Sequence, residues 1–289
     1  MKKTIILSVA LILVIAVSAV AFMGCQGTTS LTQIFSESNV WNEATFPEVF
    51  TYSMYKDGQE GSIGTLTTNV VKLDTSKTYY LGKDGIGTES DHVYGYTTAS
   101  ANATYMTTTT LTLSDGTYEQ TSIAIFANNF KMLGTYSKVV EGEKVSVYVA
   151  TNEDNKRYKY KTNADDFNEE YAIKNGKYIT SPYFDNTMVY YVARSIPNDS
   201  TYSAFTFNIF DHQTNTKEKV TLTNSCDTTY PVVIGETTFN DCRKITMTTS
   251  DTLLGTTNNI ECYITAKHNN CKSVITKIVE GSYSYLLNV

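Results

Sequence analysis

Histidine, proline and tryptophan are scarce in this 289-residue chain, which holds three histidines, four prolines and one tryptophan. The histidines, His92, His212 and His268, each lie beside a turn signal, and none stands in an H-E-x-x-H spacing. Five cysteines are present, but no two of them form the C-x-x-C pair that zinc sites commonly use. We therefore expect exposed turn histidines, no metal site and no cofactor.

Motifs of nucleotide-binding proteins and of hydrolases are also missing. Ser62 lies in G-S-I-G, which lacks the G-x-S-x-G spacing of a nucleophile elbow. The segment 82–87, GKDGIG, has neither the Walker spacing nor the G-x-G-x-x-G order of a phosphate loop. One acidic cluster lacks the residue order of an EF-hand calcium loop: Asp165, Asp166, Glu169 and Glu170. We interpret these segments as a hairpin, a turn and a solvated helix face, and we expect no enzyme.

Positive charge is in deficit, because 23 lysines and arginines stand against 29 aspartates and glutamates, for a formal net charge of −6. A negative chain is repelled by the phosphates of nucleic acids and by anionic lipid headgroups. We therefore expect no nucleic-acid partner.

Long apolar runs are confined to the first 25 residues, MKKTIILSVALILVIAVSAVAFMGC. Two lysines precede the apolar run, and the Gly24-Cys25 ending resembles a bacterial lipobox. In bacterial lipoproteins this cysteine is acylated and the peptide bond before it is cut. The resemblance implies a signal peptide over residues 1–24, a lipid on Cys25 that attaches the protein to a bacterial membrane, and an extracytoplasmic location. An uncleaved anchor is the alternative, because the run approaches the roughly 20 residues needed to span a bilayer.

The residue choice after Cys25 favours β-structure. The chain holds 22 tyrosines and 12 phenylalanines, together with threonine-rich stretches such as TYMTTTTLTL, and these residue types suit a pleated, half-buried surface. Residues 25–45 are polar with isolated hydrophobic residues, which predicts a tether. Residues 46–289 are long enough for a sizeable core, so we expect one mainly antiparallel, all-β domain, with a curved sheet in the form of a half-open barrel or a sandwich.

Alternation of apolar and polar residues predicts the individual strands. Phe50, Tyr52 and Met54 share one face, the turn signal Lys56-Asp57-Gly58 follows, and extended structure resumes over 63–73. The same alternation recurs at Phe205, Phe207 and Ile209, and again at Val220 and Leu222. Further strands are expected at 77–81, 92–98, 103–113, 117–126, 130–140, 143–150, 231–239, 241–249, 258–267, 271–280 and 283–289. His268-Asn269-Asn270 is a hairpin turn signal between two of them.

One segment interrupts the β pattern. In SPYFDNTMVYYVARSIPND, apolar residues recur at helical spacing, Asp185 or Asn186 can cap the helix N-terminus, and Pro197 ends it. This predicts an amphipathic helix near 186–196 that lies on or plugs the sheet. We expect Arg194 to bind carbonyl groups or an acidic residue of a strand rather than Asp185. A weaker helix signal covers 164–174.

Three segments together resemble an uncharacterised family of bacterial exported proteins, the domain of unknown function 3108: VFTYSMYKDGQEGSIGTLTTNVVKL, SPYFDNTMVYYVARSIP, and IGETTFNDCRKITM followed by NNIECYITAKHNNCKSVITKIVEGSYSYLL. The family pattern falls on Gly64, Gly235 and Gly281, and on a helix that carries Asp185, Asn186 and Arg194. The resemblance implies a curved sheet, shaped like a half-open barrel, with the helix near its mouth. No catalytic residue comes with it.

Four cysteines remain after Cys25: Cys226, Cys242, Cys262 and Cys271. In an exported chain they could form two disulfides in three possible pairings, or stay free as structural thiols. The sequence does not choose between these alternatives.

The features above favour a non-enzymatic, lipid-anchored β protein that binds an apolar or amphiphilic ligand, or an envelope protein, in the concavity of its sheet. One alternative is a cell-envelope hydrolase that uses paired carboxylates such as Asp165 and Glu169 as acid and base. A purely structural surface protein is the other alternative.

Overall fold

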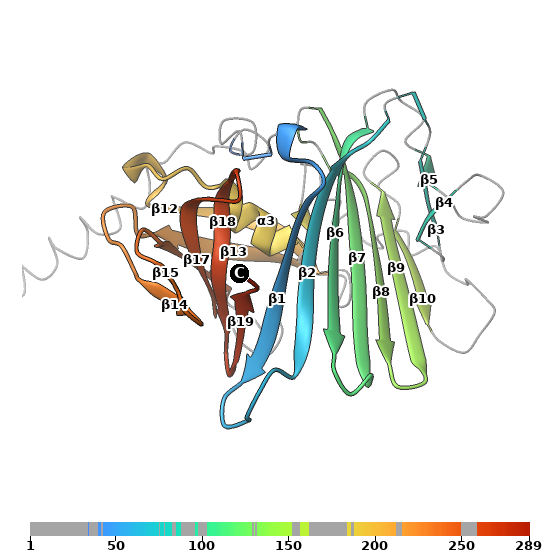
Figure 1. Cartoon of the computed structure of the whole chain (residues 1–289). Coiled ribbons are helices and arrows are strands. Elements are labelled where there is room, and N and C mark those ends of the chain that lie inside the picture. The colour runs from blue at the N-terminus through green and yellow to red at the C-terminus, as the bar shows by residue number, and fades with distance from the viewer. Residues whose placement is uncertain are drawn as a thin grey trace, which may run out of the picture. The chain divides into compact units, whose positions relative to one another are not determined.

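A single 14-stranded sheet organises the chain, and its two central strands are the first and the last in sequence (Figure 1). β1 (Glu48–Lys56) pairs antiparallel with β19 (Tyr283–Leu287), so that Tyr52 lies opposite Leu287 and Met54 opposite Tyr285. The computed structural model describes residues 34, 40–41, 43–74, 76–77, 79–82, 85–87, 96–97, 103–128, 130, 132–151, 157–161, 184–185, 188–211, 216–249 and 259–289. All of these residues belong to one unit, Leu31–Val289.

Two arms extend from this central pair. The first arm runs outward from β1 through β2 (Gly64–Lys72), β6 (Ala103–Leu113), β7 (Tyr118–Ala127), β8 (Met132–Glu141), β9 (Lys144–Thr151) and β10 (Arg157–Lys161). The second arm runs from β19 through β18 (Cys271–Glu280), β17 (Asn259–His268), β16 (Arg243–Thr249), β13 (Thr216–Asn224), β12 (Ala204–Asp211) and β11 (Phe184–Asp185). Every pairing is antiparallel except that of β11 with β12.

Smaller elements complete the described structure. β3 (Tyr80–Gly82), β4 (Gly85–Gly87) and β5 (Tyr96–Thr97) form a three-stranded sheet, and β14 (Val232–Ile234) pairs with β15 (Thr237–Phe239). The helical elements are α3 (Val189–Ser195) and the 3-10 turns η1 (Glu43–Thr45) and η4 (Ser200–Tyr202).

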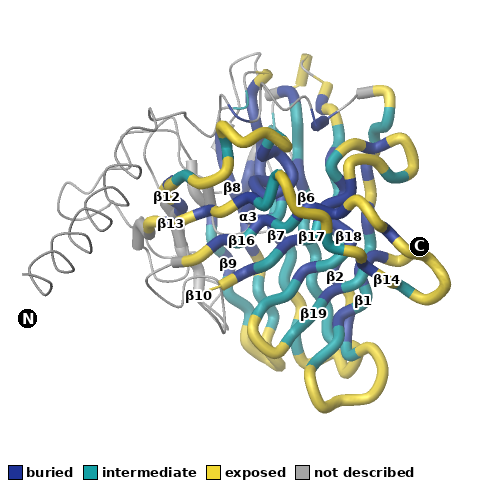
Figure 2. Tube along the Cα trace, turned by 90° about the vertical axis from the view of Figure 1, so that its left-hand side faces the viewer, coloured by how far each residue is buried: buried dark blue, intermediate teal, exposed yellow. Residues whose placement is uncertain are grey.

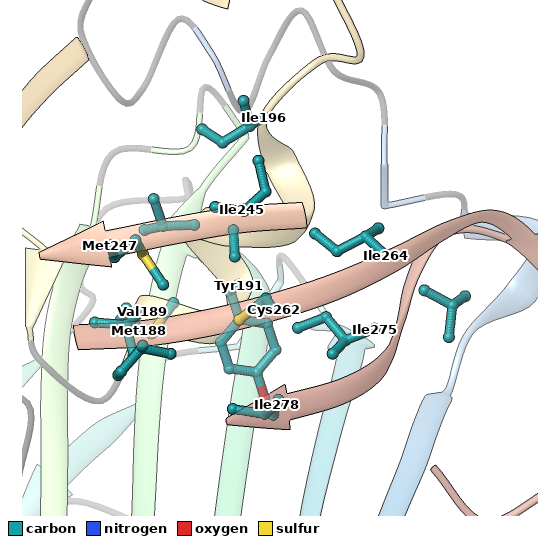
Figure 3. Close-up of a cluster of buried hydrophobic side chains, with 14 of the residues drawn as sticks. Met188, Val189, Tyr191, Ile196, Ile245, Met247, Cys262, Ile264, Ile275 and Ile278 are labelled. Atoms are coloured by element: carbon teal, nitrogen blue, oxygen red, sulfur yellow. The ribbon is translucent and has the colours of Figure 1, made fainter. Parts of the chain in front are cut away.

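Helix α3 lies against one face of the large sheet, which we call the inner face. Its neighbours include β17 and β18, and isoleucine, methionine and cysteine side chains of β16, β17 and β18 gather around it (Figure 3). Paired residues of neighbouring antiparallel strands point to the same face. The sheet register therefore extends one inner-face row across both arms: Leu113, Gly64, Met54, Tyr285, Ile278, Cys262 and Ile245.

Burial follows this arrangement. The helix and the middles of the surrounding strands are buried, whereas the hairpin ends are exposed (Figure 2). A second, smaller core lies on the opposite face of the first arm, where Ile125 and Val149 pack with Leu81 of β3. The first arm is thus covered on both faces, which explains the poor alternation of β7, where Ala124, Ile125 and Phe126 are all buried.

Gly64 lies where two strands of the sheet approach too closely for a side chain. A Cβ atom built there would lie 2.5 Å from the backbone oxygen of Thr112 and 3.3 Å from a methyl carbon of Leu113. Such a contact would force β2 and β6 apart, so the close pairing of these strands requires the missing side chain.

The predicted fold class is confirmed: the structure is mainly antiparallel β, with a large curved sheet and a short helix inside the predicted range 186–196. Predicted strands 103–113 and 271–280 match β6 and β18 residue for residue. The predicted hairpin turn at His268-Asn269-Asn270 is also present, since Asn269 and Asn270 have φ angles of 48° and 66°, as a tight hairpin turn requires.

Other expectations need correction. The predicted strand 231–239 is a hairpin, because Gly235 adopts a positive φ of 56° and reverses the chain between β14 and β15. Helix α3 begins later than predicted: Met188 is its N-cap residue, and no side chain caps it. The side chains of Asp185 and Asn186 and the helix signal at 164–174 lie outside the described residues.

The predicted tether also contributes to the core. Ile34, Val40 and Trp41 are at most 5% exposed and belong to the main hydrophobic cluster. Trp41 packs edge-on against Phe126, with 5.4 Å between the ring centroids. The isolated hydrophobic residues of this polar segment are thus anchors of the folded unit, because burying such side chains contributes about 2 kcal/mol each.

Candidate functional site

Helix α3 is held to both arms of the sheet by side chains on consecutive turns. On the first arm, the Tyr191 hydroxyl donates a 2.8 Å hydrogen bond to the carbonyl oxygen of Thr108 and contacts the hydroxyl of Thr109 at 3.2 Å. On the second arm, Arg194 donates from Nε to the carbonyl of Ser273 at 2.9 Å and from Nη2 to the carbonyl of Lys272 at 3.0 Å. The helix therefore bridges the two arms and fills the inner face between them.

A buried ion pair fixes Arg194 further. Its Nη1 contacts the carboxylate of Glu48 on β1, and the two side chains are 3% and 0% exposed. The guanidinium also lies over the ring of Phe50, 5.1 Å from its centroid. The expectation that Arg194 binds carbonyl groups or an acidic residue of a strand is confirmed in both of its versions.

Arg243 of β16 holds the C-terminal end of the helix. It donates to the carbonyl of Ile196, the C-cap residue, and to the side-chain oxygen of Asn224 at 3.0 Å. Burial lowers the pKa of Arg243 to about 10, so the residue stays charged at neutral pH. No sequence signal points to Arg243, since a lone arginine on an alternating strand belongs to no motif.

Near the N-terminal end of the helix lies a different polar group. Glu280, at the end of β18, accepts a 3.5 Å hydrogen bond from the hydroxyl of Tyr285 and a further hydrogen bond from Tyr190 of α3. Tyr118 of β7 interacts electrostatically with both Glu280 and Tyr285 from the other arm. We call Tyr118, Tyr190, Glu280 and Tyr285 the Glu280 cluster.

Burial dominates the electrostatics of the Glu280 cluster. It raises the pKa of Glu280 to about 7, even though the hydrogen bonds from Tyr285 and Tyr190 lower it. Burial likewise raises the pKa values of Tyr118, Tyr190 and Tyr285. The cluster therefore combines neutral phenols with a carboxyl group that changes its charge near neutral pH.

A track of polar side chains continues from the cluster across the inner face of the first arm. The Tyr118 hydroxyl donates to the side-chain oxygen of Gln120 at 2.9 Å, and the Gln120 amide reaches Ser122 and Ser137 at 3.4 and 3.5 Å. Ser122 and Ser137 themselves lie 3.0 Å apart. The same part of the inner face carries half-buried Leu111, so apolar and polar groups alternate there.

The four predicted cysteines are free thiols: Cys226, Cys242, Cys262 and Cys271. No disulfide joins them, although all lie on or beside strands of the second arm. Burial raises the pKa of each thiol, which lowers the fraction of reactive thiolate at neutral pH. Of the two alternatives that the sequence left open, the structure has the free structural thiols.

Several residues that the sequence singles out lie outside the described residues: the expected lipidation site Cys25, the expected turn histidines His92 and His212, and the acidic residues Asp165, Asp166, Glu169 and Glu170. His268 is described and lies at its hairpin turn, with its ring 5.5 Å from that of Phe239. Among the described residues, no group of three or more histidine, cysteine or acidic residues could hold a metal ion. A search of the same residues finds no helix with the length and apolar character of a membrane span.

Comparison with solved structures finds an alignment over most of the chain. A β-barrel-like protein of the domain of unknown function 1849 from Brucella abortus aligns with a TM-score of 0.42 and 11% sequence identity, over 83% of this chain and 94% of that one. No family model and no curated protein matches the chain. Membership in the domain of unknown function 3108 therefore stays a prediction.

Sequence reasoning did not bring the Glu280 cluster together. The sequence predicts only that Glu280 ends a strand, and its partners come from β7, α3 and β19. The surplus of tyrosine was the signal that could have pointed to it, because a tyrosine on a buried face needs a partner for its hydroxyl.

Proposed function

We propose that this chain is a non-enzymatic, lipid-anchored protein of the extracytoplasmic face of a bacterial membrane, related to the domain of unknown function 3108, and that it binds an amphiphilic ligand. The leader supports the anchor, because its Gly24-Cys25 ending matches a lipobox. The fold supports a binding role, since the inner face carries an amphiphilic surface beside α3.

One observation carries the ligand proposal: burial on the inner face is uneven. Around α3 the face is filled, and Ile245, Cys262 and Ile278 are fully buried. Beside the Glu280 cluster, by contrast, Leu111 and Leu113 are only half-buried, next to Gln120. An apolar chain could cover these leucines while a polar head meets the hydroxyl and amide groups, which is the usual arrangement of an amphiphile site.

Mass spectrometry tests the ligand. The full-length protein, expressed with its own leader in a bacterium and purified in a cleavable detergent, is analysed intact under native conditions and after solvent extraction. We expect a copurified amphiphile that disappears when Leu111→Gln and Leu113→Gln are combined. The matched control is Val233→Gln, because Val233 is 63% exposed on β14, away from the inner face. An empty wild-type protein that also binds no added amphiphile would contradict the proposal.

The anchor needs its own test. In the same preparation, the N-terminal peptide of the mature protein should begin at a diacylated Cys25. Cys25→Ser should leave the protein unacylated with its leader uncut. A wild-type peptide that starts elsewhere or carries no acyl group would contradict the anchor and leave the ligand test unaffected.

A further inference from the structure

The carboxylate of Glu280 has no cationic partner among the described residues. The titratable groups that face it are the phenols of Tyr190 from α3, Tyr285 from β19 and Tyr118 from β7, together with the thiol of Cys262 from β17. On its own face of the sheet, Glu280 lies between Tyr283 and Ile260 in the strand register. All of these groups are neutral, so ionised Glu280 is a partly desolvated negative charge.

The nearest lysine on the same row makes a different contact. Lys56 of β1 lies opposite Tyr283, and its ammonium group is 5.5 Å from the centroid of the Tyr283 ring. An ammonium group of the chain itself therefore already rests on a tyrosine next to the cluster. The contact shows that a tyrosine ring beside the cluster holds a cation, and within the cluster Tyr118, Tyr190 and Glu280 are only partly buried.

The chemistry of the cluster selects one kind of ligand. Tyrosine rings attract organic cations through their electron-rich faces, and a desolvated carboxylate attracts positive charge more strongly than it does in water. A hard metal ion would need several oxygen ligands. Glu141, opposite Tyr118, is the other carboxylate that acts on the cluster, and no group of three or more possible metal ligands lies among the described residues. An anionic head would be repelled by Glu280. An ammonium group fits both the rings and the carboxylate.

We propose that the Glu280 cluster binds the ammonium head of a cationic amphiphile, whose alkyl chain lies along Leu111 and Leu113. This inference rests on the proposed function, because it names the head group of the amphiphile that the inner face would hold. Ionised Glu280 is the counter-ion, and the tyrosine rings surround the head.

Three dodecyl amphiphiles separate head-group recognition from chain binding. The probes are dodecyltrimethylammonium, dodecyl maltoside and dodecyl sulfate, each titrated into the full-length protein below its micelle concentration and followed by calorimetry. At about pH 8 we expect the ammonium probe to bind about tenfold more tightly than the neutral probe, and the sulfate probe to bind more weakly than either. At about pH 6 the preference for ammonium should shrink, since Glu280 is then mostly protonated.

Variants assign the preference to the cluster. Glu280→Gln should abolish the ammonium preference and leave binding of the maltoside unchanged. Glu119→Gln is the matched control. It should keep the ammonium preference, because Glu119, the residue that follows Tyr118 in β7, is an exposed carboxylate. Should Glu280→Gln fail to fold, Tyr118→Phe and Tyr118→Leu replace it: the phenylalanine variant should keep the preference, and the leucine variant should reduce it.

The outcomes separate the two levels of the proposal. Equal binding of the ammonium and maltoside probes, unaffected by Glu280→Gln, overturns the ammonium site and leaves the proposed function standing. Binding of no probe overturns both. An ammonium preference that survives Glu280→Gln and Tyr118→Leu places the head group elsewhere and also overturns the inference.

Discussion

An acidic residue lies beside each end of helix α3, and the two carboxylates have different kinds of partner. Near the C-terminal end, Glu48 is buried against the guanidinium of Arg194, which two backbone carbonyls also hold. Near the N-terminal end, the partners of Glu280 are the hydroxyls of tyrosines. The first carboxylate is compensated by the charge of Arg194, whereas the second has no cationic partner among the described residues.

The largest effect is expected when the buried ion pair of Glu48 and Arg194 loses one member. Arg194→Met leaves Glu48 buried without its partner, and removing one member of a buried ion pair costs about 3–5 kcal/mol of unfolding free energy. Urea denaturation measures this loss. The double variant Glu48→Leu, Arg194→Met should recover much of it, because no unpaired charge then remains.

A more solvent-accessible ion pair provides the control for Arg194→Met. Lys244 and Glu261 lie 3.1 Å apart, with side chains 27% and 24% exposed, and Lys244→Met should cost less than about 1 kcal/mol. If both methionine variants lose the same amount, the ion pair of Arg194 is not what secures the helix, and the contrast between the two ends fails.

The carboxylate of Glu280, near the N-terminal end of α3, should make the stability of the protein depend on pH. Glu280 has a pKa of about 7 in the folded protein against 4.5 as the ordinary value, so between these values the folded state binds the extra proton. Its contribution to stability is therefore complete below about pH 4.5 and is lost as the pH rises through 7, by at most about 3 kcal/mol. Glu280→Gln should flatten this decline. The measurement is the difference in urea midpoint between wild type and variant across pH, which cancels other titrating groups.

Two tyrosine-to-phenylalanine variants should distinguish the two ends of α3 through smaller effects. Tyr191→Phe removes the hydrogen bond to the carbonyl of Thr108 and should cost about 1 kcal/mol. Tyr190→Phe removes a hydrogen bond that lowers the pKa of Glu280, so it should move the pH transition of Glu280 upward. A shift of that transition by Tyr191→Phe instead would show that the wrong tyrosine has been assigned to Glu280.

The contrast between the ends also shows what the sequence could predict. Alternation and turn residues located most of the strands, because those signals are local. The helix was found from apolar spacing and Pro197, and the behaviour of Arg194 followed from its place on a helix facing strands. The partners Glu48 and Ser273 are far from Arg194 in sequence, and no local pattern brings them together.

Local sequence patterns cannot predict the Glu280 cluster, for a related reason. β1 and β19 come from opposite ends of the domain, and their pairing brings both arms of the sheet to the same helix. Tyr118, Tyr190 and Tyr285 therefore meet only after the sheet is closed at its centre. Trp41 is likewise buried by residues far from it in sequence, such as Phe126 and Tyr191, whereas most of its sequence neighbours are polar and indicate a tether.

The smallest expected effect lies in the backbone that binds Arg194. Ser273 adopts a φ of 49°, a left-handed conformation that costs a residue with a side chain about 1 kcal/mol, and its carbonyl accepts from Arg194. Ser273→Gly removes that strain but adds freedom to the unfolded chain, so we expect a stability gain of less than about 1 kcal/mol by urea denaturation. Ser273→Ala keeps the strain and should show no gain. A clear loss of stability in Ser273→Gly, without one in Ser273→Ala, would mean that the rigidity of this backbone positions the carbonyl groups that bind Arg194. The C-terminal end of α3 would then depend on backbone conformation more than on the charge of Glu48.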